Sequence, residues 1–350
     1  MSRPLEIGRR TIGPGHPVYI VAELSANHHG RLDQALRLVA AAAEAGADAV
    51  KLQTYTADTL TLDCREEPFR IGAGTLWEGR YLHDLYREAA TPWDWHAPLR
   101  DEAQRLGLDF FSTPFDRTAV DFLERLDVPA YKVASFELVD LPLLEYIGRC
   151  GKPVILSTGM AERDEIADAV DALRRAGCPQ LALLKCTSAY PAPADEMNLR
   201  LIPALAAAFD VPVGLSDHTL ESTSAIAAVA LAASIVEKHL TLSRAVPGPD
   251  SAFSLEPAEF AATVRAIRTT EAALGTAEFT IGPSEARSRQ FRRSLFATAD
   301  IAAGETLTEF NIRSIRPAGG LPPKELPRLL GRRAKCPIPR GTPLAWELME

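Results

Sequence analysis

Short apolar runs alternate with amphipathic segments from residue 18 to about residue 275. Each run is rich in Val, Ile, Leu, Phe or Tyr and ends in polar residues. The runs show no strict alternation of apolar and polar positions, which is typical of strands that are buried on both faces. The eight predicted strands are 18–24, 49–55, 109–115, 130–135, 153–159, 181–188, 211–218 and 234–242.

The segments between these strands have the period of helices. After the first strand, apolar residues recur from Leu32 to Ala43 at helical spacing, and Gly46 ends the segment. Alternating strands and helices indicate parallel βαβ units, and eight units predict a (β/α)8 TIM barrel. A doubly wound open sheet is disfavoured, because the first turn has no Gly-rich loop. The other predicted helices are 95–106, 117–126, 140–149, 162–176, 198–209, 219–232 and 256–274.

Residues 56–90 interrupt this pattern, since they contain no strand–helix unit. Connections of this length are usually functional or disordered. Trp77, Tyr81 and Tyr86 lie within it, and Trp93 follows closely. The aromatic content predicts an ordered lid or pocket wall.

The pattern changes again after about residue 280, where short β-like pieces with turns replace the βα units. We predict a barrel domain over 1–280, a polar linker over 281–290 and a small β-rich domain over 291–350. Gly304 and Gly341 suit tight turns between short strands. A domain of this size is close to the lower limit for independent folding, so we expect it to dock on another part of the assembly.

Composition narrows the class of protein. The chain has 350 residues, 47 % of them hydrophobic and 24 % charged, with a net charge of −8, which excludes a disordered chain and a diffuse basic surface for nucleic acid. Five scattered cysteines without a CxxC pair argue against a disulfide framework or a zinc knuckle. The N-terminal residues lack the apolar core of a signal peptide, and no segment resembles a membrane span. We expect a cytoplasmic globular protein with reduced thiols.

Polar residues end all eight predicted strands, and the active site of such a barrel lies at these carboxyl ends. Lysines from four different strands, with hydroxyl groups nearby, would form a pocket for phosphate or carboxylate. They are Lys51, Lys132, Lys185 and Lys238. Lys238 has the opposite parity to its neighbours Glu237 and His239, so we expect it to point outward as a solvated charge.

Two further groups of polar residues accompany the lysines. His218 and His239 end adjacent strands, where two imidazoles with open positions could hold a catalytic divalent metal or could be structural. Carboxylates at the same end could act as general acid or base, or pair with the lysines. These carboxylates are Glu23, Glu137, Glu237 and Asp250.

Eight motifs follow one another along the predicted strands: AELSANHHG, DAVKLQTY, FFSTPFD, YKVASFE, ILSTGMA, LLKCTSAYP, GLSDHT and VEKHLTL. They resemble the sialic-acid synthase family, whose barrel enzymes condense phosphoenolpyruvate with an amino sugar to give nonulosonic acids. The segment RSLFATADIAAGETLTEFNIRSIRP is similar to the family's C-terminal antifreeze-like (SAF) β-clip domain. The resemblance implies a transferase with a TIM barrel followed by a SAF domain.

Within the family, the motifs look most like the pseudaminate branch. Leu24 and Ser25 stand where the neuraminate and legionaminate branches typically carry alanine and glycine, and Leu52 and Tyr55 stand where those branches carry phenylalanines. The branch implies 2,4-diacetamido-2,4,6-trideoxy-altrose as acceptor. The products would be pseudaminic acid and phosphate, released by C–O cleavage.

The resemblance, together with the strand ends, gives the expected site. Phosphoenolpyruvate would contact Lys51, Thr113, Lys132, Ser135, Ser157, Lys185 and Ser188. The metal, Mn²⁺ or Mg²⁺ with Co²⁺ as a third option, would bind His218 and His239. The sugar would contact Gln53, Tyr190, Asp250 and the wall residue Trp77. The expected catalytic carboxylates are Glu23, Glu137 and Glu237. Arg316 would reach into the barrel of a second subunit, which implies a domain-swapped homodimer.

Three other functions compete with this one. The chain could be an N-acetylneuraminate or legionaminate synthase, which differs in acceptor choice. It could be a metal-dependent aldolase or hydrolase on the same barrel, which would release no phosphate from phosphoenolpyruvate. It could also be a sugar-binding protein without turnover, which the many polar strand ends disfavour.

Overall fold

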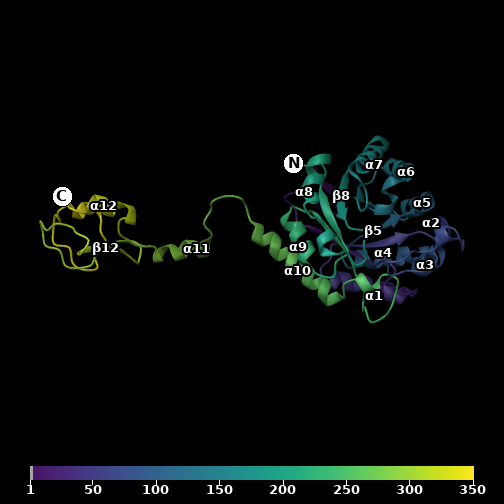
Figure 1. Ribbon diagram of the computed structural model, residues 1–350, viewed down its shortest axis with the longest axis horizontal. Coiled ribbons are helices and arrows are strands. Elements are labelled where there is room, and N and C mark those ends of the chain that lie inside the picture. Colours follow the sequence, from purple (N-terminus) through teal and green to yellow (C-terminus); the bar gives the residue numbers. More distant parts are fainter. Residues whose placement is uncertain (1–2) are drawn as a thin grey trace. The chain divides into compact units, whose positions relative to one another are not determined.

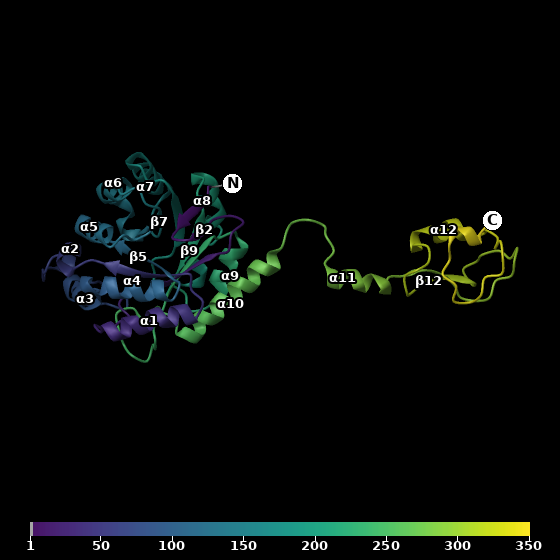
Figure 2. The same ribbon diagram turned by 180° about the vertical axis from the view of Figure 1, so that it is seen from behind.

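The computed structural model describes residues 3–350, and these residues form two compact units. The first unit ends at Gly275 and the second is Thr276–Glu350. Figures 1 and 2 draw the chain from opposite sides. Each unit has a hydrophobic core of its own. Within residues 3–350, no helix combines the length and apolar character that crossing a bilayer requires.

In the described part of the first unit, eight parallel strands close into a barrel in the order β10-β3-β4-β5-β6-β7-β8-β9. The strands are β3 (Tyr19–Glu23), β4 (Ala49–Thr54), β5 (Asp109–Pro114), β6 (Tyr131–Val133), β7 (Val154–Ser157), β8 (Leu181–Cys186), β9 (Val213–Asp217) and β10 (Ile235–His239). The closing pair places His239 beside Glu23. Every predicted strand is present, so the predicted (β/α)8 barrel is confirmed.

Helices cover the outside of the strands (Figures 1 and 2). They are α1 (Leu32–Glu44), α4 (His96–Arg105), α5 (Arg117–Arg125), α6 (Leu141–Arg149), α7 (Arg163–Ala176), α8 (Leu201–Phe209), α9 (Thr223–Ala230) and α10 (Pro257–Leu274). Each lies within one of the predicted helical segments. Local signals set their ends: Asp116 caps α5 through the backbone N–H of Ala119, and α7 ends at Gly177 in the left-handed conformation.

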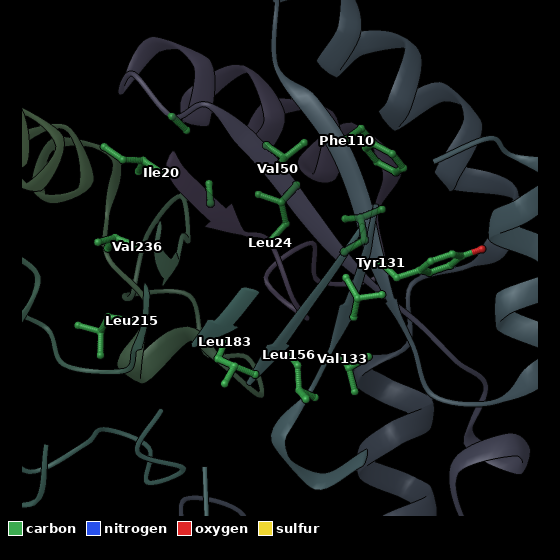
Figure 3. Close-up of a cluster of buried hydrophobic side chains, with 14 of the residues drawn as sticks. Ile20, Leu24, Val50, Phe110, Tyr131, Val133, Leu156, Leu183, Leu215 and Val236 are labelled. Carbon is green, nitrogen blue, oxygen red and sulfur yellow. The ribbon is translucent and has the colours of Figure 1, made fainter. Parts of the chain in front are cut away.

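Alternate residues of each strand face opposite sides of the barrel wall. One set packs outward against the helices and forms the larger core (Figure 3). Members of this set are Ile20, Val50, Phe110, Tyr131, Leu156, Leu183, Leu215 and Val236. The other set points into the barrel, where it is apolar near the amino ends of the strands.

A short hairpin at the N-terminus adds to this inner apolar layer. It consists of β1 (Leu5–Ile7) and β2 (Arg10–Ile12), and its turn contains Gly8 in a left-handed conformation, where a side chain would overlap the carboxylate of Asp109. Leu5, Ile7 and Ile12 cluster with barrel residues such as Tyr19, Phe111, Ile155 and Ile235. Arg10 donates to Asp109 over 3.0 Å, which anchors the hairpin to β5. The hairpin closes the amino end of the barrel and was not predicted from the sequence.

The segment 56–90 is ordered, as predicted. It contains α2 (Ala57–Leu60), the 3₁₀ turn η1 (Glu67–Phe69) and α3 (Leu82–Ala89). The indole Nε1 of Trp77 donates to the carbonyl of Pro249 over 2.8 Å. This contact joins the segment to the loop that follows β10.

The second unit is small and built from short strands and turns. It contains α11 (Pro283–Ser288), the antiparallel pair β11 (Ser294–Ala297) and β12 (Ile312–Ile315), and α12 (Leu326–Leu329). α11 lies within the predicted linker. Gly304 and Gly341 adopt the left-handed conformation that tight turns need. The core consists of ten buried residues, among them Leu295, Leu307, Ile338 and Leu344.

Candidate active site

The inward-facing residues become polar at the carboxyl ends of the strands. Eight of these residues are almost inaccessible to solvent, although they carry an ionisable group or a hydroxyl group. They are Glu23, Lys51, Thr113, Lys132, Ser157, Ser216, Glu237 and His239. Charged side chains are almost never buried this deeply unless they are paired or bind a ligand.

Four of these residues form one ion-pair cluster. Lys51 contacts the carboxylate of Glu23, and its Nζ lies 3.6 Å from Oε1 of Glu237. The same Glu237 oxygen lies 3.9 Å from Nζ of Lys132 and accepts from Ser216 over 3.3 Å. Two cations thus share two carboxylates inside a closed barrel.

Burial and these charges separate the pKa values of the two carboxylates. Burial raises the pKa of Glu23 above its usual range, and the neighbouring lysines reduce this rise. Burial also acts on Glu237, but Lys132 and Lys51 outweigh it and lower its pKa. Burial lowers the pKa of Lys132. Glu237 therefore ionises more readily than Glu23, and Lys132 loses its proton more readily than an exposed lysine.

Beside Lys132 lies a group of donors suited to an anion. Lys132 Nζ donates to Ser157 Oγ over 2.7 Å, and Lys51 Nζ donates to Thr113 Oγ1 over 3.4 Å. The backbone N–H of Gly159 donates to Ser135 Oγ over 3.0 Å. A side chain at Gly159 would overlap the hydroxyls of Ser188 and Ser135, so glycine lets both approach. Hydroxyl, amide and ammonium donors together suit phosphate or carboxylate.

The structure does not bring all four lysines together. Lys185 shares the parity of the outward-facing Leu183, and its Nζ donates to the carbonyl of Cys186 and to Thr187 Oγ1. It lines a cavity of about 590 Å³ with residues of α7 and α8. Lys238 points outward, as predicted, but it is not solvated. It is 2 % exposed and donates to Asp217 Oδ2 over 2.7 Å.

His218 and His239 lie side by side, with ring centroids 5.4 Å apart. His218 Nδ1 lies 2.9 Å from the carbonyl of Thr187, so Nε2 is the nitrogen that carries the lone pair when the ring is neutral. Burial lowers the pKa of His239 well below its usual range, and its Nδ1 is buried without a partner among the described residues. Burial also opposes charge on His218, but its contacts with Cys186 and Thr187 raise its pKa. Two imidazoles, one of them held neutral with an orphaned nitrogen, fit a divalent metal that takes its remaining ligands from water or substrate. Residues 3–350 contain no cluster of three or more His, Cys, Asp or Glu suited to a metal.

On the other side of Glu23 lies a group of neutral donors and aromatic rings. Gln53 Nε2 donates to Glu23 Oε1 over 3.2 Å and to Ser25 Oγ over 3.3 Å. Ser25 contacts the carboxyl of Asp250, and burial raises the pKa of Asp250 to about 7. Trp77 adjoins this region through its hydrogen bond to Pro249, the residue before Asp250. The arrangement suits a polyhydroxylated or amide-bearing ligand with one apolar face.

The aromatic wall continues to the histidines. The ring of Tyr190 lies 5.6 Å from Trp77 and 4.4 Å from His218. Phe253, in the 3₁₀ turn η5 (Ser251–Phe253), lies 4.9 Å from both Tyr190 and His239. The predicted sugar contacts and the predicted metal ligands are thus continuous in space.

Two predicted residues lie apart from these contacts. Glu137, in η3 (Ser135–Val139), has a carboxylate oxygen that is buried without a partner in the described chain, and burial raises its pKa to about 7. Arg316 belongs to the second unit, where it is exposed next to the end of β12.

Sequence reasoning assigned no role in the site to Ser25, Phe253 or Cys186. Ser25 and Cys186 have the inward parity of Glu23 and Leu184, and parity could have identified them. The thiol of Cys186 lies 3.7 Å from Ser188 Oγ, and its contacts, including that with His218, lower its pKa to about 7 against the effect of burial. Phe253 carries no such signal, because its loop has no regular period.

Comparison with known proteins identifies the family. Residues 38–279 match the NeuB family and residues 292–350 match the SAF domain. A curated relative, the pseudaminic acid synthase of Helicobacter pylori, is 46 % identical over 335 residues, which cover 95 % of this chain and 98 % of the relative. The N,N'-diacetyllegionaminic acid synthase of Legionella pneumophila is 35 % identical over 98 % of both chains.

A solved structure agrees with this assignment. The N-acetylneuraminic acid synthetase of Leptospira borgpetersenii superposes with a TM-score of 0.73 at 32 % identity, covering 82 % of this chain and 95 % of that one. The two family matches include strands β4 to β10 of the barrel and strands β11 and β12 of the second unit. The chain therefore belongs to the NeuB family and carries a SAF domain at its C-terminal end.

Proposed function

We propose that this protein is a pseudaminic acid synthase, which condenses phosphoenolpyruvate with 2,4-diacetamido-2,4,6-trideoxy-altrose and releases phosphate. One observation carries the proposal: Glu23, Lys51, Lys132 and Ser157 form an anion pocket that is continuous with a wall of neutral and aromatic groups. One half suits a phosphorylated acid and the other an amide-bearing sugar. Relatives named for the pseudaminate reaction support this acceptor, with 44–46 % identity against 35–36 % for those named for legionaminate.

The anion pocket would orient phosphoenolpyruvate. Lys132 and Ser157 would bind one of its acidic groups, and Ser135, Gly159 and Ser188 the other. The second substrate would lie between Gln53, Asp250 and the aromatic wall. This places C3 of phosphoenolpyruvate next to the sugar aldehyde, so that much of the barrier is lowered by position alone.

The charge that develops during the reaction would lie next to charged groups of the barrel. As C3 attacks the aldehyde carbon, positive charge builds at C2, next to the fixed carboxylate of Glu237. Water adds at C2, and Glu23, whose pKa is raised by burial, accepts its proton. The tetrahedral intermediate loses phosphate by cleavage of the C–O bond, and Lys132 can neutralise the leaving group.

A divalent metal, Mn²⁺ or Mg²⁺, would bind His218 and His239 and polarise the aldehyde oxygen of the sugar. The lowered pKa of His239 and the orientation of His218, whose Nδ1 faces the Thr187 carbonyl, support this assignment. Because His218 has a raised pKa, protons compete with the metal, and affinity should fall as the pH is lowered.

We also propose that the protein works as a domain-swapped homodimer, in which the SAF domain of one copy covers the barrel mouth of the other. Large apolar side chains are exposed in the loops at the carboxyl ends of the strands, which favours a covered mouth. They include Phe136, Val139, Met160, Leu220 and Val246. Arg316 would then complete the sugar pocket in trans.

Subunit complementation tests this swap. Glu23→Gln and Arg316→Ala should each be inactive alone. After mixing and subunit exchange, half of the dimers would carry one intact site, so about a quarter of wild-type activity should return. If both variants are inactive alone, no recovery from proven heterodimers would show that Arg316 acts within its own chain.

We place the reaction in the cytoplasm. All five cysteines of the chain are free, a state that a reducing compartment maintains.

Acceptor choice tests the function. Phosphate release from phosphoenolpyruvate is measured with Mn²⁺ and each of three acceptors: the altrose derivative, its manno-configured legionaminate counterpart and N-acetylmannosamine. Turnover confined to the altrose derivative is the expected result. Preference for another acceptor would overturn the branch but keep the family chemistry, and no phosphate with any of them would overturn the synthase.

A further inference from the structure

One buried hydroxyl joins the catalytic half of the site to the sugar half. Ser25 follows β3, is 1 % exposed and contacts both Gln53 and Asp250. Its backbone has φ of 47°, in the left-handed region that residues other than glycine rarely adopt. Strained conformations of this kind persist where surrounding contacts hold them, and they concentrate at functional sites.

The hydrogen bonds around Ser25 can run in one direction only. Nε2 of Gln53 uses its two protons on Glu23 Oε1 and Ser25 Oγ, at 3.2 and 3.3 Å. The opposite orientation of the amide would point its oxygen at the Glu23 carboxylate. Ser25 Oγ therefore accepts from Gln53, and its own proton is left for Asp250.

Asp250 receives that proton on one oxygen. Oδ2 also accepts the backbone N–H of Ala26, at 3.3 Å, so this oxygen has two donors. Neither Oδ1 of Asp250 nor Oε1 of Gln53 accepts a hydrogen bond from any residue in 3–350. The hydrogen bonds that link Glu23, Gln53, Ser25 and Asp250 thus leave Gln53 Oε1 and Asp250 Oδ1 as acceptors for a ligand. Ser25 holds both of these side chains in place.

We propose that Ser25 is a positioning residue that determines acceptor specificity, because its hydroxyl holds Gln53 and Asp250 as a matched pair of hydrogen-bond acceptors. The ligand that fits the pair carries two N–H or O–H donors, as a sugar with two acetamido groups does. This rests on the proposed function, since it assigns that pair to the sugar rather than to phosphoenolpyruvate. A sugar of another configuration, whose donors point elsewhere, would cover one of these two oxygens without pairing it, and this is a strong basis for discrimination.

The test compares Ser25→Gly and Ser25→Ala with the wild type. Glycine removes the hydroxyl and also relieves the left-handed backbone, so this variant should fold at least as well. Asp210→Gly is the matched control: Asp210 is exposed beyond α8, has φ of 51° and gains the same backbone relief. Kinetics are measured for both substrates, and binding of the reduced, unreactive form of the sugar is measured by calorimetry in the presence of phosphoenolpyruvate.

Both Ser25 variants should raise KM for the altrose derivative about tenfold and weaken binding of the reduced sugar equally, with KM for phosphoenolpyruvate changed less than about twofold. The preference for the altrose derivative over N-acetylmannosamine should fall by a similar factor. Asp210→Gly should leave all of these values unchanged.

Three outcomes would overturn the proposal: an unchanged sugar KM in Ser25→Gly, equal increases in both KM values, or impairment of Ser25→Ala alone, which would assign the effect to the backbone. Failure of the proposed function is seen separately, because the wild type would then turn over no altrose derivative.

Discussion

The two ends of the barrel are built on opposite principles. At the amino end, Leu5, Ile7 and Ile12 of the hairpin are inaccessible and pack on apolar residues inside the strands. At the carboxyl end, Lys51, Lys132 and Glu237 are buried almost as deeply, but as ions. Apolar burial stabilises the fold directly, whereas buried ion pairs add little net stability because desolvation opposes their attraction. The amino end therefore contributes most to the stability of the barrel. The carboxyl end contributes less, because its buried ions serve the reaction.

The largest expected effect tests the carboxyl end. Lys132→Met should lower kcat/KM by about 10³-fold, because the anion loses its buried cation in the transition state. Lys51 still faces Glu237, and burial already disfavours the charge on Lys132, so the melting temperature should fall by only a few degrees. Steady-state kinetics and calorimetric melting of the same preparation check both statements. A large loss of stability together with the activity would contradict the division of roles.

The matching change at the amino end should have the opposite result. Leu5→Ala should lower the free energy of unfolding by about 2–4 kcal/mol, because Leu5 is 0 % exposed and its neighbours cannot fill the space. Activity per folded molecule should be unchanged. Leu274→Ala, at a leucine that is 52 % exposed, is the control and should cost much less. Denaturant unfolding gives the free energies, and an inactive but stable Leu5→Ala protein would refute the comparison.

The outward-facing Lys238 joins β10 to the loop that follows β9 at the carboxyl end of the barrel. Its Nζ donates to Asp217 Oδ2 and to the carbonyls of Thr219 and Glu221. The first of these residues precedes His218 in the chain and the other two follow it. Lys238→Met should weaken Mn²⁺ binding about tenfold by releasing the loop that positions His218. Titration of Mn²⁺ without substrates measures this, and Lys152→Met, which breaks a surface ion pair, should leave it unchanged. Equal Mn²⁺ affinity in the two variants would show that the loop holds its shape without Lys238.

The last prediction concerns the stability that the protein loses when the buried carboxyl group of Asp250 ionises. Burial raises its pKa from 3.8 to about 7, so folding becomes less favourable as the pH rises through this range and the group must ionise inside the site. Asp250→Asn removes the charge. The stability of this variant relative to the wild type should therefore rise from pH 4 to pH 7 and then level off. A difference that does not vary with pH would show that Asp250 ionises freely.

Period and parity account for what the sequence predicted correctly. Uninterrupted apolar runs identified all eight strands, and parity alone places Glu23, Lys51 and Gln53 on one face of the wall. The same rule predicts that Lys185 faces the helices with Leu183, whereas its place at a strand end alone suggests that it joins the other lysines. The structure therefore separates Lys185 from Lys51 and Lys132.

Parity could have placed Ser25 in the site, but the hairpin and the contacts of Ser25 depend on geometry that no period encodes. The hairpin strands β1 and β2 have three residues each, too few for a pattern to be recognised. The role of Ser25 depends on a left-handed backbone and on a contact with Asp250, which lies 225 residues later in the chain. Resemblance to a family supplied the reaction, since composition and spacing reached only an anion pocket beside two histidines.

One isotope experiment tests the central claim, that the mouth of this barrel condenses phosphoenolpyruvate with an amino sugar by C–O cleavage. Phosphoenolpyruvate labelled with ¹⁸O at the bridging oxygen is incubated with the altrose derivative, Mn²⁺ and the protein, and both products are analysed by mass spectrometry. One phosphate should be released per nonulosonic acid formed, with the label in the phosphate. Label retained in the organic product, or consumption of the sugar without release of phosphate, would contradict it.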